Sequence, residues 1–492
     1  MMAVRASSQV NLADLLAGMG AAGSASPAVS GLALDSREVR PGDCFIALSG
    51  AREHGIRHAA AAAAAGAVAV LTEDIDVLPR LGIPVLRIDH LRQRVGEIAA
   101  RFYGQPAQSM AVIAVTGTNG KTTVAHLCAD ALRTLHGKSG YFGTLGSGLF
   151  GALEGSVNTT PDPLHLQRSL AGLRDAGCAH VALEASSHAL DQGRLNGLDI
   201  GVAVFTGLGH DHLDYHGTLE AYGRAKQRLF AHAGLHTAVI NLDDGYAPAI
   251  LAAVKSGVRV LTYGMRPSAD VQAVAFDCDG RGSRIDVRCP DGSVTLHSAL
   301  VGDFNVQNLL AALGALIATG ASATAAAAAL STARPVRGRM ELAAAAPCVY
   351  VDYAHSPDSL ERVLATVRAL TRGRVICVFG CGGDRDASKR PLMGAIAERD
   401  ADYVFVTADN PRSEGPAAIA AQILLGMQVP TGGHVQVMLD RAAAIAAAVG
   451  AAGPDDAVLI AGKGHETTQT TGQEAMPFDD VAVVRRLLGT EP

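Results

Sequence analysis

Several features that define whole classes of protein are missing from this sequence. It has no tryptophan, no block of basic residues and no long, strongly apolar run. Nucleic-acid binding needs clustered positive charge, and the formal net charge is -6, so nucleic acid is not an expected partner. The longest apolar runs are rich in alanine and too weakly hydrophobic or too short to span a bilayer, and the N-terminus lacks a basic region followed by an apolar stretch. We therefore expect a cytoplasmic protein without a membrane span.

Cysteine pairs with a recognisable spacing are also missing. The eight cysteines are scattered, and the nearest two, Cys377 and Cys381, lack the two-residue separation of a zinc knuckle or a redox dithiol. We expect reduced cysteines in or near the core.

What the chain does contain is an alternation of apolar runs and helical stretches. The strand candidates are 68–71, 84–88, 110–115, 181–183, 202–205, 238–240, 349–351, 375–379, 403–406 and 458–460. Such alternation predicts an α/β fold with a mostly parallel sheet and helices on both faces. Breaks occur at the polar segment 104–108 and after the alanine-rich helix candidate 321–333. We predict three domains, residues 1–106, 107–335 and 336–492, of which the last is Rossmann-like.

The clearest motif is a glycine-rich loop between a strand candidate and a helix candidate. It reads Gly117-Thr118-Asn119-Gly120-Lys121-Thr122-Thr123. Glycines let backbone N–H groups face a phosphate, Lys121 can neutralise it, and Thr122 can reach Mg²⁺. Val115 stands where the strict motif has its first glycine, so the loop is a shortened variant. An ordinary turn before a helix is the alternative, but both flanks favour ATP binding in a P-loop ATPase-type central domain.

Two further segments indicate metal chemistry beside this loop. Glu184 ends a strand candidate, at the edge where open α/β sheets hold their ligands. The segment Gly207 to His216 contains three histidines and two aspartates. Zinc is an alternative because imidazole suits it, and a solvated polar loop is another. The position beside the phosphate loop favours Mg²⁺.

Together these segments resemble the Mur ligase family over nearly the whole chain. The resemblance also rests on Asp211-His-Leu-Asp214, Tyr222 to Lys226, Asn305-Val-Gln-Asn308 and Asp352-Tyr-Ala-His355, which occur in the family's order. Within the family the chain is most similar to ligases that add 2,6-diaminopimelate to a peptidoglycan precursor. The resemblance implies an N-terminal domain for a UDP group, a central ATPase domain and a C-terminal domain for the incoming amino acid.

The resemblance assigns roles to individual residues. Lys121, Lys226 and His212 would be catalytic, with Mg²⁺ held by Thr122, Glu184, His212 and a carbamylated Lys226. The phosphate loop, Asn308, Arg339 and Asp352 would bind ATP. The UDP-N-acetylmuramoyl-L-alanyl-D-glutamate contacts would be Leu34, Ser36, Ala51, Arg52, Glu53, Asn158, Thr159, Thr160, Ser186, Gln192 and Arg194. The amino-acid contacts would be Arg390, Asp409, Asn410, Pro411, Arg412, Gly462 and Glu466.

Asp409-Asn-Pro-Arg412 marks, by the same resemblance, ligases for meso-2,6-diaminopimelate. This diamino acid differs from lysine by a distal carboxylate, which a planar guanidinium can bind with two parallel hydrogen bonds. Lysine would leave Arg412 unpaired. Gly207 and His210 stand where related sequences commonly have Asn and Arg, so we expect small differences in that loop.

The implied reaction is ATP-dependent amide formation through an acyl phosphate, by an enzyme that we expect to be monomeric. The alternatives are a lysine-adding or folylpolyglutamate ligase of the same family, an ATP hydrolase without ligase activity, and a non-enzymatic nucleotide-dependent scaffold.

Overall fold

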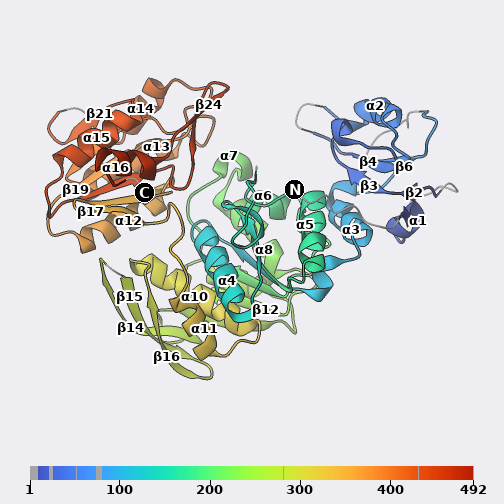
Figure 1. Cartoon of the computed structure of the whole chain (residues 1–492), viewed down its shortest axis with the longest axis horizontal. Coiled ribbons are helices and arrows are strands. Elements are labelled where there is room, and N and C mark those ends of the chain that lie inside the picture. The colour runs from blue at the N-terminus through green and yellow to red at the C-terminus, as the bar shows by residue number, and fades with distance from the viewer. Residues whose placement is uncertain are drawn as a thin grey trace.

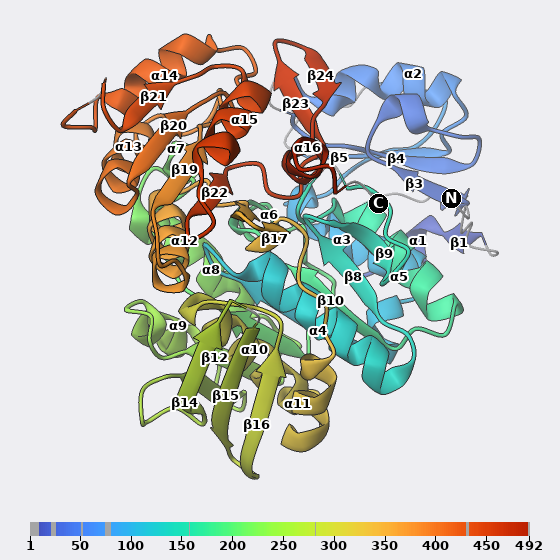
Figure 2. The same cartoon turned by 60° about the vertical axis from the view of Figure 1, so that its left-hand side comes forward.

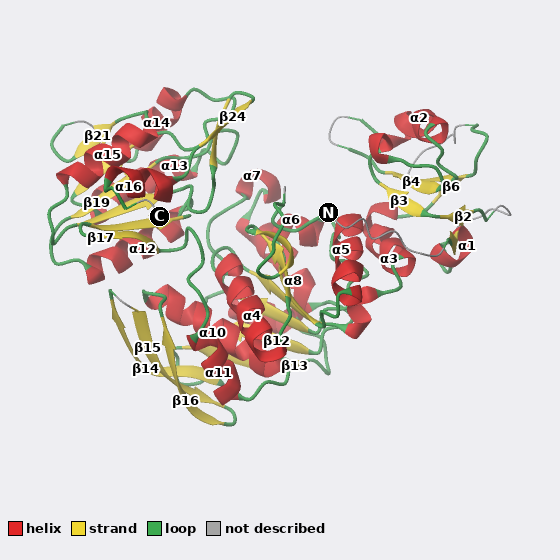
Figure 3. Cartoon of the chain, viewed as in Figure 1, coloured by secondary structure: helices red, strands yellow, loops and turns green. Residues whose placement is uncertain are grey.

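The computed structural model describes residues 9–20, 26–50, 53–73, 80–156, 158–280, 282–429 and 432–490. Figure 1 shows an N-terminal lobe in blue, a central lobe in cyan to yellow and a C-terminal lobe in orange to red. Each lobe contains its own parallel or mostly parallel sheet with helices packed against it (Figure 3). No helix within these ranges is long and apolar enough to cross a membrane.

The N-terminal lobe is built on a small parallel sheet. Its order is β3 (Gly31–Ala33), β4 (Asp43–Ala47), β5 (Ala69–Thr72) and β6 (Val85–Arg87). Apolar side chains of β4 alternate between two cores, so that Cys44 and Ile46 face one and Phe45 and Ala47 the other. The helices are α1 (Leu12–Leu15), α2 (Ala59–Ala64) and α3 (Leu91–Phe102), and the short strands β1 (Val10–Asn11) and β2 (Ala28–Val29) pair beside α1.

The central lobe carries a ten-stranded sheet. Its order is β16 (Gly292–Ser298), β15 (Gly282–Cys289), β14 (Val271–Asp279), β13 (Arg259–Gly264), β12 (Thr237–Asn241), β11 (Val202–Phe205), β7 (Ala111–Thr116), β10 (His180–Glu184), β8 (Gly140–Gly143) and β9 (Gly146–Leu149). The seven strands that lie between β14 and β8 in this order, both included, are parallel, whereas β9, β15 and β16 are antiparallel additions at the two edges. The predicted mostly parallel sheet is confirmed, and the hairpin extension β14–β16, seen at the bottom of Figure 2, was not predicted.

Helices cover both faces of this sheet, as the sequence pattern predicts. Alternate residues of β7 enter two cores, Ile113 and Val115 on one side, Val112 and Ala114 on the other. The first core includes side chains of α4 (Lys121–His136), α10 (Asp303–Ala318) and α11 (Ala323–Ser331). The second includes α5 (Pro163–Asp175), α8 (Leu219–Phe230) and α9 (Ala247–Ala253). Burial of both faces explains why these strands read as continuous apolar runs.

The C-terminal lobe repeats this architecture on a six-stranded sheet. The order is β17 (Glu341–Ala345), β18 (Cys348–Asp352), β22 (Ala457–Ala461), β19 (Val375–Phe379), β20 (Tyr403–Val406) and β21 (Val435–Val437), and β17 alone among them is antiparallel. Its helices are α12 (Pro357–Leu370), α13 (Lys389–Asp400), α14 (Pro416–Leu424), α15 (Arg441–Ala451) and α16 (Asp480–Leu487), and a hairpin, β23 (Thr468–Thr471) and β24 (Glu474–Pro477), stands outside the sheet.

Candidate active site

The phosphate loop lies where the order of the central sheet changes direction. Strand β7 has β10 on one side and β11 on the other, and the loop runs from the end of β7 to the first residue of α4. Ligands of open α/β sheets bind at the carboxyl ends of strands at such a crossover. Gly117 and Gly120 have φ values of +154° and +85°. A Cβ on Gly120 would lie 2.5 Å from Asn308 Oδ1, so both the backbone and the space require glycine there.

The ammonium group of Lys121 folds back over its own loop. Its Nζ donates to the carbonyl oxygens of Gly117 (2.9 Å) and Thr118 (2.8 Å). Burial lowers the pKa of Lys121, an effect that the nearby carboxylates of Glu184 and Asp211 oppose. A phosphate in the loop would therefore compete with two internal hydrogen bonds for this lysine.

Glu184, at the end of β10, is fully buried and rigidly held. Oε1 accepts hydrogen bonds from Tyr141 OH (2.8 Å) and from the backbone N–H of Thr144 (2.7 Å). Oε2 accepts one from Thr122 Oγ1 (2.9 Å). The structure thus brings together Thr122 and Glu184, both of which were predicted from the sequence to be Mg²⁺ ligands.

Lys226 projects from α8 and contacts the same loop. Its Nζ donates to Gly117 O (2.7 Å) and lies 4.2 Å from the centroid of the Tyr222 ring, and the side chain is 1% exposed. Burial lowers the pKa of Lys226 well below its usual value, and the neighbouring charge of Lys121 adds to this effect. The amine is thereby biased towards the neutral form, which is the form that reacts with CO₂.

A cluster around Asp211 lines the same cavity as the phosphate loop. Asp211 Oδ2 lies 3.5 Å from His212 Nε2 and 3.8 Å from His355 Nε2, so it joins the central lobe to the C-terminal one. Burial lowers the pKa of both His212 and His355, which favours the neutral imidazole that can bind a metal ion. His212 has a left-handed backbone (φ 54°), a conformation that non-glycine residues rarely adopt and that occurs often at functional sites.

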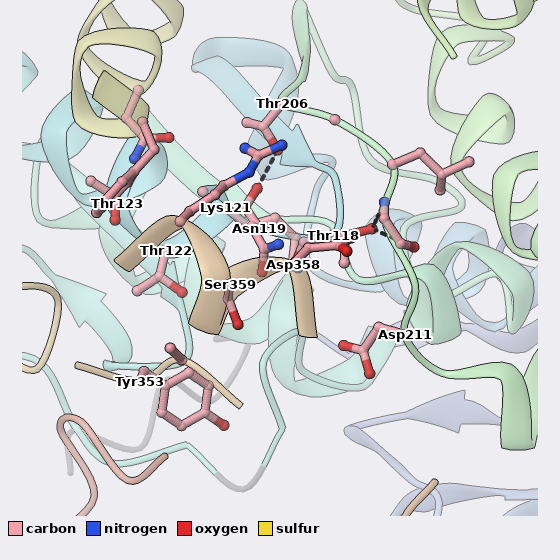
Figure 4. A pocket seen from close by; sticks show the side chains of 18 of the residues that line it. Thr118, Asn119, Lys121, Thr122, Thr123, Thr206, Asp211, Tyr353, Asp358 and Ser359 are labelled. Carbon is pink, nitrogen blue, oxygen red and sulfur yellow. Dashed lines mark hydrogen bonds between the residues drawn. The ribbon is translucent and has the colours of Figure 1, made fainter. Parts of the chain in front are cut away.

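The residues predicted to contact the nucleotide line the same cleft. Arg339 donates from Nη2 to Thr122 Oγ1 (3.2 Å), and its guanidinium carbon lies 4.3 Å from the centroid of the Tyr353 ring. Asp352 Oδ2 accepts from the N–H of Met340 (2.7 Å), and burial raises the pKa of Asp352 to about 6. Asn308, Arg339 and Asp352 thus border one cavity together with the phosphate loop. Figure 4 shows loop residues from Thr118 to Thr123 and Asp211 among the residues that line this cavity, together with Tyr353, Asp358 and Ser359 of the C-terminal lobe.

The residues predicted to contact the muramoyl dipeptide fall into two groups. Thr160, Ser186, Gln192 and Arg194 form one network beside Glu184: Arg194 donates to Thr160 O (2.9 Å) and to Gln192 Oε1 (3.0 and 2.7 Å), and Thr160 Oγ1 donates to Glu184 O (2.6 Å). Thr159 and Ser186 line the cavity, and Asn158 lies exposed beside them.

The second group lies in the N-terminal lobe and does not border this cavity. Leu34 follows β3, Ser36 begins a short 3₁₀ helix (Ser36–Glu38), and Glu53 is exposed with its Oε1 3.1 Å from His58 Nε2. Ala51 and Arg52 lie outside the described residues.

The residues predicted to bind the amino acid gather at the carboxyl ends of β19, β20 and β22. Asn410 Nδ2 donates to Glu466 Oε2 (2.7 Å), Arg412 Nη1 donates to Gly383 O (2.7 Å), and a Cβ on Gly462 would lie 2.3 Å from Asp409 Oδ2. Pro411 is buried between Asn410 and Arg412. Arg412, like His212, has a left-handed backbone (φ 51°).

Arg390, predicted to contact the amino acid, is paired within the protein. It is completely buried and donates to both carboxylate oxygens of Glu414 (2.8 Å each) and to Gln422 Oε1 (2.7 Å). Its Nε has no partner among the described residues. The role of Arg390 as an amino-acid contact stays a prediction.

Sequence reasoning did not find several residues of the site. Thr144, Tyr141 and Glu414 act through hydrogen bonds to predicted site residues that are 24 to 43 positions away. Their only signal in the sequence was position: Tyr141 lies on an apolar strand, and Glu414 follows Arg412 by two residues. Asp358 and Tyr353 face the cavity from the C-terminal lobe, which only the fold brings near the phosphate loop.

Fold and site together define a three-lobed α/β protein with a phosphate loop at the crossover of its central sheet and a cavity that residues of the C-terminal lobe also line. Residues 28–103 match the Mur ligase family catalytic domain, 115–316 the Mur ligase middle domain and 338–464 the Mur ligase glutamate ligase domain. The chain belongs to the Mur ligase family and is an ATP-dependent amide ligase.

Relatives with similar sequences and structures have specific names. The chain is 47% identical over 467 residues to a UDP-N-acetylmuramoyl-L-alanyl-D-glutamate–2,6-diaminopimelate ligase of Xanthomonas campestris, covering 94% of each chain. A Pseudomonas aeruginosa relative of the same name is 46% identical over 93% of this chain and 94% of its own. A solved structure of a ligase of that name is similar with a TM-score of 0.72 and 38% identity, covering 98% and 99% of the two chains.

A more distant likeness concerns the fold. A Mycobacterium tuberculosis folylpolyglutamate synthase, solved with ADP and AMPPCP, has a TM-score of 0.64 at 20% identity and covers 82% of this chain and 96% of its own.

Proposed function

We propose that this ligase joins the γ-carboxylate of the D-glutamate in UDP-N-acetylmuramoyl-L-alanyl-D-glutamate to an amine of meso-2,6-diaminopimelate, in peptidoglycan precursor synthesis. The observation that carries the proposal is the pairing of a phosphate-loop cleft with an arginine-bearing loop, Asp409 to Arg412, in one chain. The names of relatives that match over 94% of the chain support the same substrates.

The strands form a separate main sheet in each of the three predicted domains, which supports a different binding function for each domain. We assign residues 1–106 to the UDP group, 107–335 to ATP and 336–492 to the incoming amino acid. Each sheet draws its strands from one of these ranges, and Leu34, Ser36 and Glu53 lie in the first.

The chain's own residues account for the chemistry of the first step. A carboxylate of the dipeptide attacks the γ-phosphorus of ATP, and the bond from that phosphorus to the β,γ-bridging oxygen breaks. ADP departs, and the dipeptide carries an acyl phosphate. Lys121 would move from Gly117 O and Thr118 O to the phosphoryl oxygens, where its positive charge stabilises the transition state. Arg339, beside Thr122, would add a second positive charge at the same place.

In the second step the neutral amine attacks the acyl carbon, the nitrogen loses a proton, and the tetrahedral adduct breaks its bond to the phosphate oxygen, which gives the amide and free phosphate. Water would hydrolyse the acyl phosphate, so the C-terminal lobe must cover the cleft during chemistry. Tyr353, His355 and Asp358 are residues of the C-terminal lobe that line the cavity.

The donor set of the cleft fits Mg²⁺. Among the described residues there is no group of three or more His, Cys, Asp or Glu side chains that could hold a metal ion. Mg²⁺ is commonly held by one or two protein oxygens with water and phosphate completing its shell. Thr122 and Glu184 offer such oxygens, and His212 would add an imidazole nitrogen. When bound, Mg²⁺ would neutralise charge on the phosphates.

We propose carbamylation for Lys226. The neutral amine would attack CO₂, forming an N–C bond and releasing a proton, and the resulting anion would offer an oxygen ligand beside the loop. The burial of Lys226 and its position at Gly117 O support this assignment. Incubation with ¹³C-bicarbonate should give one carbamate ¹³C signal that Lys226→Met lacks, and retention of that signal in the variant would refute the assignment.

Acceptor-dependent phosphate release tests the whole proposal. The protein is incubated with ATP, Mg²⁺ and the UDP-muramoyl dipeptide, and phosphate is measured with meso-diaminopimelate, L-lysine or no amino acid. We expect release that depends on diaminopimelate, with a new amide product. Preferential use of lysine would refute the specificity, and release without any acceptor would favour a hydrolase. That the protein works as a monomer and in the cytoplasm stays a prediction.

A further inference from the structure

Lys463 is a fully buried lysine beside the predicted amino-acid site. It follows β22 by two residues, and its side chain is 0% exposed. Its ammonium group donates to Asn410 Oδ1 (3.1 Å), Glu466 Oε2 (3.1 Å) and Thr468 O (2.7 Å). An ammonium has three N–H donors, and these bonds use all of them. Lys463 therefore acts on neighbouring protein groups and has no donor left for a bound molecule.

The first of these groups is the carboxylate of Glu466. Its Oε2 accepts hydrogen bonds from both Lys463 and Asn410 Nδ2 (2.7 Å), and Asn410 Oδ1 is fixed in turn by the N–H of Thr470 (2.9 Å). Within the described part of the chain, no hydrogen bond reaches Oε1 of Glu466. The glutamate side chain is 29% exposed, so Oε1 can accept a hydrogen bond from a ligand. Lys463 thus fixes one oxygen and leaves the other free.

The second group is the hairpin that supports Arg412. Thr468, whose carbonyl accepts from Lys463, is the first residue of β23. Further along this hairpin, Thr470 O accepts from the N–H of Arg412 (3.1 Å), and the N–H of Gly472 donates to Arg412 O (2.7 Å). These two bonds hold Arg412 in its left-handed backbone conformation. One buried ammonium therefore anchors both the acidic and the basic side of the site.

We propose that Lys463 is a positioning residue for amino-acid selectivity, an inference that rests on the proposed function. The distal end of diaminopimelate carries an ammonium and a carboxylate on one carbon. Recognition of both needs a carboxylate and a guanidinium at a fixed separation, and Lys463 links the segments that carry Glu466 and Arg412. Its positive charge also compensates the negative charge held beside it, which a neutral side chain could not do.

The test is a comparison of Lys463→Met and Lys463→Gln with the unchanged protein. Methionine keeps the length of the side chain, and glutamine keeps a donor without the charge. We expect the KM for meso-diaminopimelate to rise about tenfold or more in Lys463→Met, the loss of a charge-assisted hydrogen bond being of that order. The KM values for ATP and the dipeptide, and kcat, should change by less than about threefold, and Lys463→Gln should lie between.

A double-mutant cycle tests whether Lys463 acts through Glu466. If it does, Glu466→Gln and Lys463→Met together should cost less than the product of their separate effects on the KM for diaminopimelate. Lys138→Met is the matched control, since Lys138 also donates to a backbone carbonyl, that of Ala176 (2.8 Å), but in the central lobe.

Two results would overturn the inference: an unchanged KM for diaminopimelate in the folded variants, or multiplicative effects in the cycle. Folding is checked by the ATP-induced rise in Tm, and Lys463→Gln alone carries the comparison if Lys463→Met does not fold. Failure of the unchanged protein to release phosphate in response to diaminopimelate would refute the proposed function instead, before any variant is measured.

Discussion

At the scale of single residues, burial decides what the charged groups of this ligase can do. Lys121 and Lys226 both donate to Gly117 O, whereas Lys463 donates to Asn410, Glu466 and Thr468 in the C-terminal lobe. The sequence places Lys121 and Lys226 through motifs. It does not single out Lys463, because a buried lysine and an exposed one look alike in a sequence. Likewise, nothing in the sequence predicts that Glu414 forms an ion pair with Arg390.

The first prediction concerns Arg412. In Arg412→Lys the planar guanidinium is lost, so the two parallel hydrogen bonds that we propose for the distal carboxylate could no longer form. Hydrogen bonds to charged groups contribute about 1.5–3 kcal/mol, so the KM for meso-diaminopimelate should rise about tenfold or more. Initial rates of phosphate release at varied diaminopimelate measure this.

The control for that prediction is Arg385→Lys, an exposed arginine of the neighbouring loop that donates to Asp384 O (3.2 Å). It should leave the KM for diaminopimelate unchanged. Equal effects of the two substitutions would show that Arg412 has no special part in recognition.

At the scale of helices and strands, the sequence was informative for several strands that are buried on both faces, although β4 and β8, which are buried in the same way, were not predicted. Strands β11, β19 and β20 have the bounds that their apolar runs predict, Val202–Phe205, Val375–Phe379 and Tyr403–Val406. The hairpin extension β14–β16 was missed, because exposed residues alternate with buried ones along β15 and leave no apolar run.

The second prediction uses the two ends of helix α4. Gly120 and Gly137 have nearly the same backbone conformation, with φ values of +85° and +82°. Alanine at either position should cost about 1 kcal/mol of unfolding free energy for the left-handed backbone. At Gly120 the new Cβ would also meet Asn308 Oδ1 at 2.5 Å, whereas at Gly137 nothing lies within 4 Å.

Only Gly120→Ala should therefore weaken ATP binding, measured as the ATP-induced shift in Tm. Gly137→Ala, which has the same backbone cost without the clash, is the control. A full ATP-induced shift in Gly120→Ala would contradict the view that the loop must approach Asn308 closely.

The third prediction concerns pH and the loops at the other end of the C-terminal sheet. Asp456 accepts hydrogen bonds from the Arg374 guanidinium (3.0 and 2.6 Å) and from the N–H groups of Gly453 and Arg374. These bonds lower the pKa of Asp456 to about 2. Because the folded pKa lies below the unfolded value of about 3.9, the stabilisation is present above about pH 4 and is lost as the pH falls towards 2.

Denaturant unfolding of the wild type and Asp456→Asn between about pH 6 and pH 3 checks this. The wild type should be the more stable at pH 6, and the difference should shrink below about pH 4. A difference that stays constant over this range would mean that the aspartate charge is not what stabilises the loop.

At the scale of the whole molecule, the site exists only because two lobes meet. The family resemblance predicted site residues in both lobes, but not the contacts between the lobes, since those depend on how the C-terminal lobe lies against the central one. His210 N donates to Asp358 Oδ2 (3.1 Å), and Asp211 Oδ2 lies 3.8 Å from His355 Nε2. The departure from the family at His210 falls at this contact.

The fourth prediction follows from that contact. Asp358→Ala removes the acceptor on α12 that the loop of His210 uses, so the lobes should separate more easily. We expect a larger radius of gyration by small-angle X-ray scattering in the presence of ATP, and a lower kcat. Glu361→Ala is the control, since Glu361 lies on the same helix but pairs within its own lobe, with Arg399. Unchanged scattering and kcat in Asp358→Ala would assign closure to other contacts.

The folded-back ammonium of Lys121 has a consequence for affinity. Because Gly117 O and Thr118 O already hold this ammonium, ATP must displace two existing bonds to reach it. The measured dissociation constant is then larger than the intrinsic one by the reciprocal of the fraction of molecules whose lysine is free. The loop carries its own competitor for the lysine, and the affinity for ATP is a difference between two sets of hydrogen bonds.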